Sequence, residues 1–277
     1  MIKISNLVYQ YPAKNDPSHK ALDSISLTLH EGEAVALMGS NGCGKTTLAH
    51  CLAAILIPQQ GEVWIDNLNT RDQKSHVEIH KRVGLVFQNP ENQIVTVTVE
   101  REIAFGLENL GIPQNKMREI VDAMLEKFQL TQYRYHPPHR LSGGELQRLA
   151  LATVMSMSPK YLIFDEPTSL LDPPGRKMVL TMIQELLNEN FEKPRDQKVA
   201  VLFITQFPEE ALHFSRLLVM HQGRLVKDGS PMEIFQNVDE LLELGVPVPP
   251  EFQVNQWLKH LSRGKISFNS SDFLSIF

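Results

Sequence analysis

Short apolar runs bounded by turn residues recur along the chain and alternate with longer segments whose apolar residues follow helical spacing. The runs stand at 34–39 (AVALMG), 83–87 (VGLVF), 161–166 (YLIFDE) and 199–205 (VAVLFIT). Helical spacing is clear at 117–128 and at 144–157. Buried strands that alternate with helices predict an α/β fold with a mostly parallel sheet, covered by helices on both faces.

Three regions depart from this alternation. The stretches 21–30 (ALDSISLTLH), with period two, and 61–66 (GEVWID) predict antiparallel strands flanking the first strand and helix. The region from about 90 to 157 is mostly helical in pattern and predicts an inserted helical subdomain. The stretch 217–229 is typical of a hairpin that turns at Gln222 and Gly223.

The alternation of apolar runs and helical segments ends at about Ser230. A short helix is expected at 231–235, then a proline cluster at 246–250 and an amphipathic stretch through Trp257 and Leu261. The final dozen residues are rich in serine, and we expect them to be poorly ordered. The predicted organisation is one α/β domain over 1–230 and an accessory helical extension over 231–277.

Composition excludes several classes of protein. With 277 residues, 42% of them hydrophobic, the chain can bury a large core, while a net charge of −5 leaves no broad basic field for nucleic acid. The longest apolar runs fall short of the roughly 20 residues that a transmembrane helix needs. The first residues are polar where a signal peptide is apolar, so we expect the chain in the cytosol. Cys43 and Cys51 are expected to be small packing residues rather than a zinc site or a disulfide.

The stretch GSNGCGKT at 39–46 matches G-x-x-x-x-G-K-[ST] and stands between an apolar strand and a helical segment. Its glycines allow successive backbone N–H groups to converge on phosphate oxygens at a helix N-terminus. Lys45 would neutralise the β and γ phosphates, and Thr46 would offer its hydroxyl to Mg²⁺. A chance match in a glycine-rich turn is disfavoured by this context. The expected nucleotide-binding residues are Gly39, Ser40, Asn41, Gly42, Cys43, Gly44, Lys45, Thr46 and Thr47.

The stretch YLIFDEP at 161–167 predicts a buried strand that delivers two carboxylates to the C-terminal edge of the sheet. Asp165 is expected to hold Mg²⁺ through water, and Glu166 to polarise the attacking water as a general base. The alternative is a solvated acidic pair at a strand end, which the P-loop in the same chain disfavours.

The stretch LSGGELQR at 141–148 opens a predicted helix and forms a second anion site. That site lies about a hundred residues from the P-loop, so both cannot readily serve one γ-phosphate, and the second is expected to serve a partner's nucleotide. The alternative is an ordinary helix cap. The residues concerned are Leu141, Ser142, Gly143, Gly144 and Glu145.

A P-loop, then LSGGE, then Asp-Glu is the order of the ATP-binding cassette (ABC) ATPases, which the chain resembles over roughly residues 1–230. The resemblance implies a P-loop NTPase core with an antiparallel β subdomain on the N-terminal side and an inserted helical subdomain. It also implies ATP and Mg²⁺ as cofactors. Such ATPases form head-to-tail pairs that hold two ATP molecules between the P-loop of one subunit and the LSGGE of the other.

The resemblance assigns further residues. Tyr11 matches the aromatic that stacks on adenine, with Tyr9 as a competitor, and Gln88 matches the glutamine that reaches Mg²⁺ and the attacking water. Asp172, in SLLD, matches the loop that crosses the dimer interface.

Gln206 stands where most of these ATPases have a histidine that contacts the γ-phosphate. An amide can donate a hydrogen bond to phosphate, but it carries neither a proton for transfer nor a charge at neutral pH. We therefore expect slow hydrolysis at this chain's own P-loop. A heterodimer with a histidine-bearing ATPase is favoured, and a homodimer is the alternative.

The stretch 87–111 (FQNPENQIVTVTVEREIAFGLENLG) resembles the ATP-binding subunits of energy-coupling factor (ECF) importers and of cobalt and nickel importers. This resemblance implies uptake of a vitamin or a transition-metal ion with a transmembrane coupling subunit and a substrate-binding membrane subunit. The chain would then lie on the cytoplasmic face of a bacterial or archaeal membrane. Ile103, Phe105 and Leu107 are expected to line a groove for the coupling subunit, unless they pack the helical insert. The tail resembles the family's extension, which adds to the dimer contact.

A soluble ABC ATPase of DNA repair or chromosome maintenance is the rival interpretation. Those proteins carry a long coiled coil or a zinc insert between P-loop and LSGGE, and the interval here has neither pattern. A phosphotransferase would have no use for LSGGE.

Overall fold

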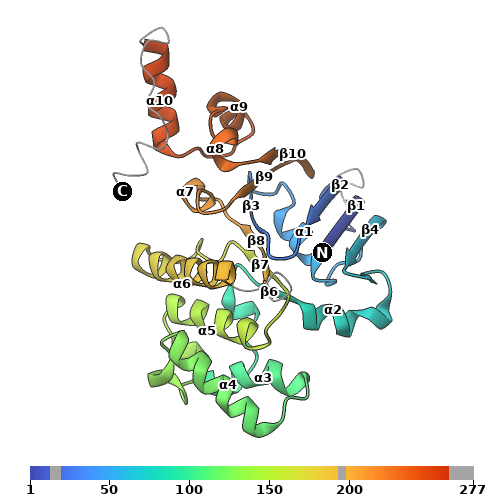
Figure 1. The fold of residues 1–277 in the computed structure, drawn as a ribbon, viewed down its shortest axis with the longest axis vertical. Coiled ribbons are helices and arrows are strands. Elements are labelled where there is room, and N and C mark those ends of the chain that lie inside the picture. The colour runs from blue at the N-terminus through green and yellow to red at the C-terminus, as the bar shows by residue number, and fades with distance from the viewer. Residues whose placement is uncertain (13–19, 193–197, 262–277) are drawn as a thin grey trace.

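The computed structural model describes residues 1–12, 20–192 and 198–261, which form two sheets with helices around them (Figure 1). The larger sheet has the strand order β10-β9-β3-β8-β7-β6. Its strands are parallel except β10, which pairs antiparallel with β9. The strands are β3 (Ala34–Gly39), β6 (Val83–Val86), β7 (Tyr161–Asp165), β8 (Ala200–Ile204), β9 (Arg216–His221) and β10 (Arg224–Gly229). The predicted strands and the hairpin that turns at Gln222 and Gly223 are confirmed.

Strand β3 is buried on both faces, as its continuous apolar run predicts. Successive side chains of a strand point to opposite faces. Val35 and Leu37 accordingly join one hydrophobic cluster, and Ala36 and Met38 join another. The sheet therefore lies between two cores, and its C-terminal edge is the part left open for a ligand.

The smaller sheet has the order β2-β1-β4-β5 and is antiparallel throughout, as the period-two stretches predict. Its strands are β1 (Ile2–Tyr9), β2 (Leu22–Leu29), β4 (Gln60–Ile65) and β5 (Leu68–Asn69). One core unites apolar residues of this sheet, of the larger sheet and of α1 (Lys45–Leu52). Cys43 and Cys51 are free thiols buried in this core, so the expectation that they are packing residues is confirmed.

The other core lies under the helices that follow β6 and β7. They include α3 (Val99–Asn109), α4 (Gln114–Lys127), α5 (Gly143–Ser156) and α6 (Pro173–Glu192), which lie together in Figure 1. Ile103 and Leu107 are fully buried in this core, so the expectation that they line a groove was wrong, whereas Phe105 is 43% exposed. A helix that packs on the core with one face buries positions four apart and exposes those between them.

Shorter elements complete the domain. They are α2 (His76–Arg82), α7 (Pro208–Ala211) and four 3₁₀ turns: η1 (Gln73–Ser75), η2 (Pro90–Asn92), η3 (Thr131–Tyr133) and η4 (Pro138–Arg140).

The tail after Ser230 forms α8 (Pro231–Ile234), α9 (Val238–Glu243) and α10 (Pro250–Leu261). Its apolar residues Phe235, Leu241 and Val246 are fully buried and belong to the same core as α3 to α6. The tail is thus packed onto the domain. The final residues, expected to be poorly ordered, lie outside the described part of the chain.

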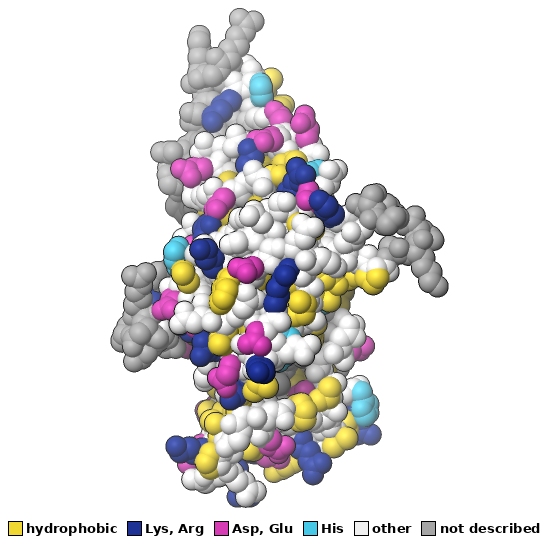
Figure 2. All heavy atoms as spheres, turned by 90° about the vertical axis from the view of Figure 1, so that its right-hand side faces the viewer, with side chains coloured by type: hydrophobic (Ala, Val, Ile, Leu, Met, Phe, Trp, Pro, Cys, Tyr) yellow, Lys and Arg dark blue, Asp and Glu magenta, His cyan; other side chains and the backbone are white. Residues whose placement is uncertain are grey.

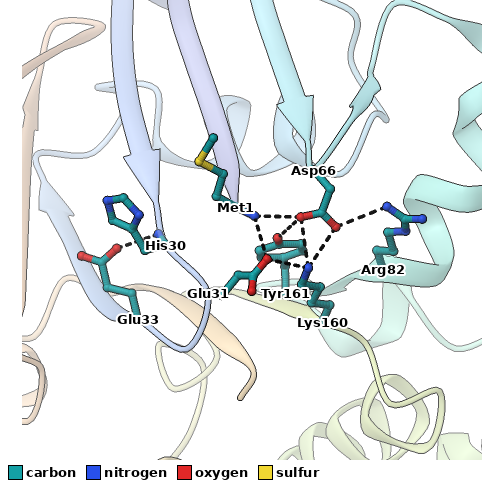
Figure 3. A network of polar contacts seen from close by, with 8 residues as sticks. All are labelled: Met1, His30, Glu31, Glu33, Asp66, Arg82, Lys160 and Tyr161. Carbon is teal, nitrogen blue, oxygen red and sulfur yellow. Dashed lines mark hydrogen bonds and ion pairs between the residues drawn. The ribbon is translucent and has the colours of Figure 1, made fainter. Parts of the chain in front are cut away.

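A polar cluster joins the small sheet to the start of β7 (Figure 3). The Asp66 carboxylate, just after β4, accepts hydrogen bonds from Tyr161 Oη at 2.6 Å, from the Met1 amino group at 2.7 Å and from Lys160 Nζ at 3.1 Å. Burial alone would raise the pKa of Asp66, but these donors lower the pKa to about 2. A carboxylate stabilised in this way ties two segments that are far apart in sequence.

We expect Asp66→Asn to lower the free energy of unfolding near neutral pH by about 1–3 kcal/mol, because it removes a charged acceptor from four donors, the three above and Arg82 Nη1 at 3.2 Å. Because the folded pKa is depressed, the carboxylate's contribution is present above its unfolded pKa of about 4 and is lost as pH falls from there towards about 2. Urea unfolding of both proteins over this pH range checks it. Glu78→Gln, which breaks an exposed pair with Lys81, is the control and should change little. Equal losses in the two variants would contradict the role of Asp66.

Candidate functional site

The P-loop runs from the end of β3 into α1 along a path that excludes side chains at two positions. A Cβ at Gly39 would lie 2.3 Å from the Met220 carbonyl oxygen, and one at Gly44 would lie 2.2 Å from that of Ala21. Gly44 also has a φ of +109°, which L side chains rarely adopt, and it precedes the first turn of α1. The glycines therefore permit the path that turns backbone N–H groups towards an anion at the N-terminus of α1.

The side chain of Lys45 is held beneath the P-loop by backbone carbonyl groups of the loop. This side chain is 5% exposed, and Nζ donates to the carbonyl oxygens of Gly39 at 2.9 Å and of Ser40 at 3.3 Å. Nζ also lies 3.5 Å from Glu166 Oε1. A buried ammonium next to converging N–H groups makes the site strongly favourable for a polyphosphate.

The residues predicted from separate motifs meet in one open cleft of about 570 Å³. Predicted residues that line it are Tyr11, Asn41, Gly42, Gly44, Lys45, Thr46, Thr47, Gln88, Glu166 and Gln206. Gly39 and Ser40 contribute the carbonyl groups that hold Lys45, and the Cys43 side chain turns into the core, where burial raises the pKa of its thiol. Cys43 can therefore offer a ligand only its backbone.

Three lining residues were missed by sequence reasoning: Ala21, Ser169 and Leu170. Ser169 follows Glu166 by one tight turn and donates from its hydroxyl to the Glu166 carbonyl oxygen at 3.0 Å. Its position after the acidic pair is a signal that could have found it. Ala21 reaches the cleft only through the fold, and no local pattern marks it.

Glu166 and Gln88 form the polar wall of the cleft. Gln88 Nε2 donates to Glu166 Oε2 at 3.2 Å and lies 3.4 Å from the Ser169 hydroxyl. Glu166 has a φ of +47°, uncommon for a residue with a side chain, and its N–H donates to the Ile204 carbonyl oxygen at 3.0 Å. Such conformations cluster at functional sites. Gln206 enters the same cleft from the end of β8.

Asp165 lies deeper, 2% exposed, at the end of β7. Burial raises the pKa of its carboxyl to about 6, against a hydrogen bond with Thr46 that lowers it. Its Oδ1 is buried and has no hydrogen-bond partner among the described residues. A carboxylate oxygen, a threonine hydroxyl and the Gln88 amide are the oxygen ligands that Mg²⁺ takes, so these residues fit a magnesium ion.

Tyr9 and Tyr11, the two candidates for stacking on adenine, differ in how far they are exposed. Tyr9 is buried at the end of β1, whereas Tyr11 is 46% exposed beside the cleft, with its hydroxyl 3.2 Å from Thr47 Oγ1. The two rings meet edge to face with centroids 5.0 Å apart. Of the two rings, only Tyr11 is exposed and lines the cleft, where a planar ligand can reach it.

A second hollow of about 380 Å³ surrounds the start of α5. Ser142 caps this helix in a capping box with Glu145, as the S-x-x-E spacing predicts. The hollow is lined by Ser142, Gly143, Gly144, Glu145 and Asp172 among others, and it shares only Leu170 with the P-loop cleft. None of the signature residues Leu141 to Glu145 lines the P-loop cleft of the same chain.

A third groove, about 660 Å³ and mainly apolar, runs between residues 91–97 and 137–146. Leu141 lines this groove and not the signature hollow. Val95 and Val97 are each 66% exposed there. The buried Glu102 carboxylate fixes the loop by accepting from the N–H groups of Val95 at 3.1 Å and of Thr96 at 2.8 Å.

The charge distribution on the surface and the lengths of the helices agree with what the composition predicts. Basic and acidic side chains are interspersed over the face in Figure 2, which carries no broad basic field among the described residues. None of the helices in the described ranges is both long and apolar enough to cross a bilayer.

Comparison with known proteins identifies the family. The ABC transporter family model matches residues 22–169. The chain is 39% identical over 276 residues to the energy-coupling factor transporter ATP-binding protein EcfA1 of Clostridium novyi, covering 100% of this chain and 95% of that protein. It is 43% identical over 249 residues to the cobalt import ATP-binding protein CbiO of Syntrophus aciditrophicus, covering 90% and 85%.

A solved structure shares the fold. The cbiO1 structure from Clostridium perfringens, described as part of the ABC transporter complex cbiONQ, matches with a TM-score of 0.74 at 29% identity, covering 91% of this chain and 97% of that one. The P-loop cleft and the separate signature hollow agree with these likenesses. The chain therefore belongs to the ABC transporter family, as an ATP-hydrolysing subunit of the energy-coupling factor and cobalt-import type.

Proposed function

We propose that this chain pairs head to tail with a second ABC ATPase and powers the uptake of a vitamin or a transition-metal ion through membrane partners. The observation that carries the proposal is the separation of the P-loop cleft from the signature hollow within one chain. Each half-site needs a complement from another subunit. Asp172, exposed on the rim of the signature hollow, is placed to meet that subunit.

ATP would lie along the cleft from Tyr11 to Glu166. Tyr11 would stack on adenine, and the N–H groups before α1 with Lys45 would hold the phosphates. Magnesium would be held by Thr46, Gln88 and, through water, Asp165, and its charge would offset the charge that develops on the phosphates. The phosphates would also draw Lys45 away from Glu166, leaving that carboxylate free to orient a water.

Gln206 weakens hydrolysis at this site. It can hydrogen-bond a phosphate oxygen, but it cannot carry the proton or positive charge of the usual histidine. His213 and His221 do not line the cleft, and His221 Nδ1 lies 3.2 Å from the Leu244 carbonyl oxygen. We infer that this site mainly binds ATP, and that a heterodimer leaves fast hydrolysis to the partner's site, which LSGGE of this chain completes.

Two surfaces would take the remaining partners. The apolar groove at residues 91–97 and 137–146 would receive short helices of a transmembrane coupling subunit, which holds the chain on the cytoplasmic face of a bacterial or archaeal membrane. A separate membrane subunit would select the solute. Helix α10 presents Val254, Trp257 and Leu261, which would add to the dimer contact.

A soluble role in DNA repair or chromosome maintenance is disfavoured. The described chain between P-loop and signature holds no helix longer than the 14 residues of α4, so it has no long coiled coil.

Tyr11→Ala should weaken ATP binding by the isolated chain about tenfold or more, because a base stacked on an aromatic ring contributes about 1–3 kcal/mol. Equilibrium titration with a fluorescent ATP analogue measures it. Tyr135→Ala removes another exposed tyrosine, 74% exposed on the helical subdomain, and should leave the affinity unchanged. Equal effects of the two variants would mean that Tyr11 does not contact the base.

Val97→Glu should abolish recovery of the chain with its membrane partners, because it puts a charge into the apolar groove. Co-purification from detergent-solubilised membranes measures it. Val77→Glu on α2 is the control, since Val77 is 65% exposed and Val97 66%. If Val97→Glu still co-purifies as the unaltered chain does, the groove is not the docking site.

Glu166→Gln and, separately, Gln206→His should leave ATP turnover of the assembled transporter little changed, because fast hydrolysis is assigned to the partner's site. Replacing the partner's corresponding glutamate should abolish turnover. A large loss with Glu166→Gln alone would refute the asymmetric assignment.

A further inference from the structure

A buried carboxylate behind the active site joins three loops that the proposed dimer uses. The side chain of Glu210, in α7, the short helix that follows β8, is 0% exposed. It accepts hydrogen bonds from Thr168 Oγ1 at 2.9 Å and from the Thr205 hydroxyl, and it forms an ion pair with Arg176 Nε at 2.7 Å. A charge so fully removed from water is stable only when it is paired and hydrogen-bonded, as here.

Each of the three donors stands in or beside a different functional segment. Thr205 immediately precedes Gln206, and Thr168 follows Glu166 by two residues. Arg176 stands in the first turn of α6. Asp172 fixes the start of this helix, because the Asp172 carbonyl oxygen accepts a hydrogen bond from the Arg176 N–H at 2.9 Å. The Asp172 carboxylate also accepts from the N–H of Gly175 at 3.1 Å.

Arg176 holds the Gln206 loop from a second side. Its guanidinium lies 3.4 Å from the centroid of the Phe207 ring, and it also pairs with Glu209 at 2.8 Å. The N–H of Phe207 donates to Thr205 Oγ1 at 3.0 Å. Both neighbours of Gln206 in the chain are therefore fixed, one through Glu210 and the other through Arg176.

We infer that the Arg176–Glu210 ion pair joins the loop that carries Asp172 and the loop that carries Gln206 into one rigid unit, so that closure of the dimer at Asp172 sets the position of Gln206 at the nucleotide. Arg176 and Glu210 are positioning residues, since neither lines the ATP cleft. The inference rests on the proposed dimer. Beyond that dimer, the inference names the residues, Arg176 and Glu210, through which contact with the partner at Asp172 affects Gln206 at the phosphate site of the same chain.

The test is ATP turnover of the assembled transporter carrying Arg176→Ala. The ion pair also anchors the first turn of α6, next to Asp172 on the rim of the signature hollow, which completes the partner's site, where fast hydrolysis is assigned. Because Arg176→Ala frees Asp172 as well as Gln206 without touching nucleotide, kcat should fall about ten- to hundredfold while KM for ATP stays unchanged. Arg176→Lys, which keeps the charge beside Glu210, should restore part of kcat. Arg216→Ala is the matched control: Arg216 is 23% exposed against 20% for Arg176, and it too bridges two carboxylates, those of Glu33 and Asp228. It should leave both constants unchanged.

A second variant guards against simple unfolding. Arg176→Ala strands a buried charge, so the double variant Arg176→Met with Glu210→Gln removes both charges together. It should melt near the unaltered protein and still show the loss of kcat. An unchanged kcat in the double variant, or an equal loss with Arg216→Ala, overturns the inference.

The two proposals fail in different ways. If the chain does not assemble with a second ATPase and membrane subunits, the proposed function fails before Arg176 is tested. If the complex assembles and turns over ATP but does not respond to Arg176, the coupling alone is wrong.

Discussion

The backbone path of the P-loop is the constraint on which the rest of the structure depends. Gly39 and Gly44 pass so close to the carbonyl groups of Met220 and Ala21 that any side chain would collide. This path turns N–H groups outward at the start of α1 and folds Lys45 beneath them. The negative charge of a triphosphate is costly to remove from water, and only such a concentration of donors can compensate it.

The parallel sheet brings the other chemical groups to the same place. Strand β8 lies between β3 and β7, so Glu166, which follows β7, and Gln206, which follows β8, reach the cleft beside the P-loop that follows β3. The antiparallel sheet contributes Tyr11 from outside this arrangement. The signature at the start of α5 lines a different hollow, and this separation is the basis of our proposal that a second subunit completes each site.

Much of this could be predicted from the sequence, because the decisive residues stand in local patterns. The P-loop, the acidic pair at 165–166 and the S-x-x-E cap each follow from strand and helix signals within a few residues. The groove wall could not be predicted, because α3 turns Ile103 and Leu107 into the core and leaves Val95 and Val97, in a loop fixed by Glu102, at the surface. The Glu210 cluster was also missed, since its members are brought together only by the fold.

Because Gln206 replaces the usual histidine, we propose that the site of this chain holds ATP while the partner's site hydrolyses ATP. The nucleotide bound to this chain during turnover tests the claim most directly. The assembled transporter would be photolabelled with radiolabelled azido-ATP during steady turnover and quenched, and the phosphate content of the label on each ATPase subunit would be determined. The account predicts intact triphosphate on this chain and diphosphate on its partner; equal diphosphate on both would contradict it.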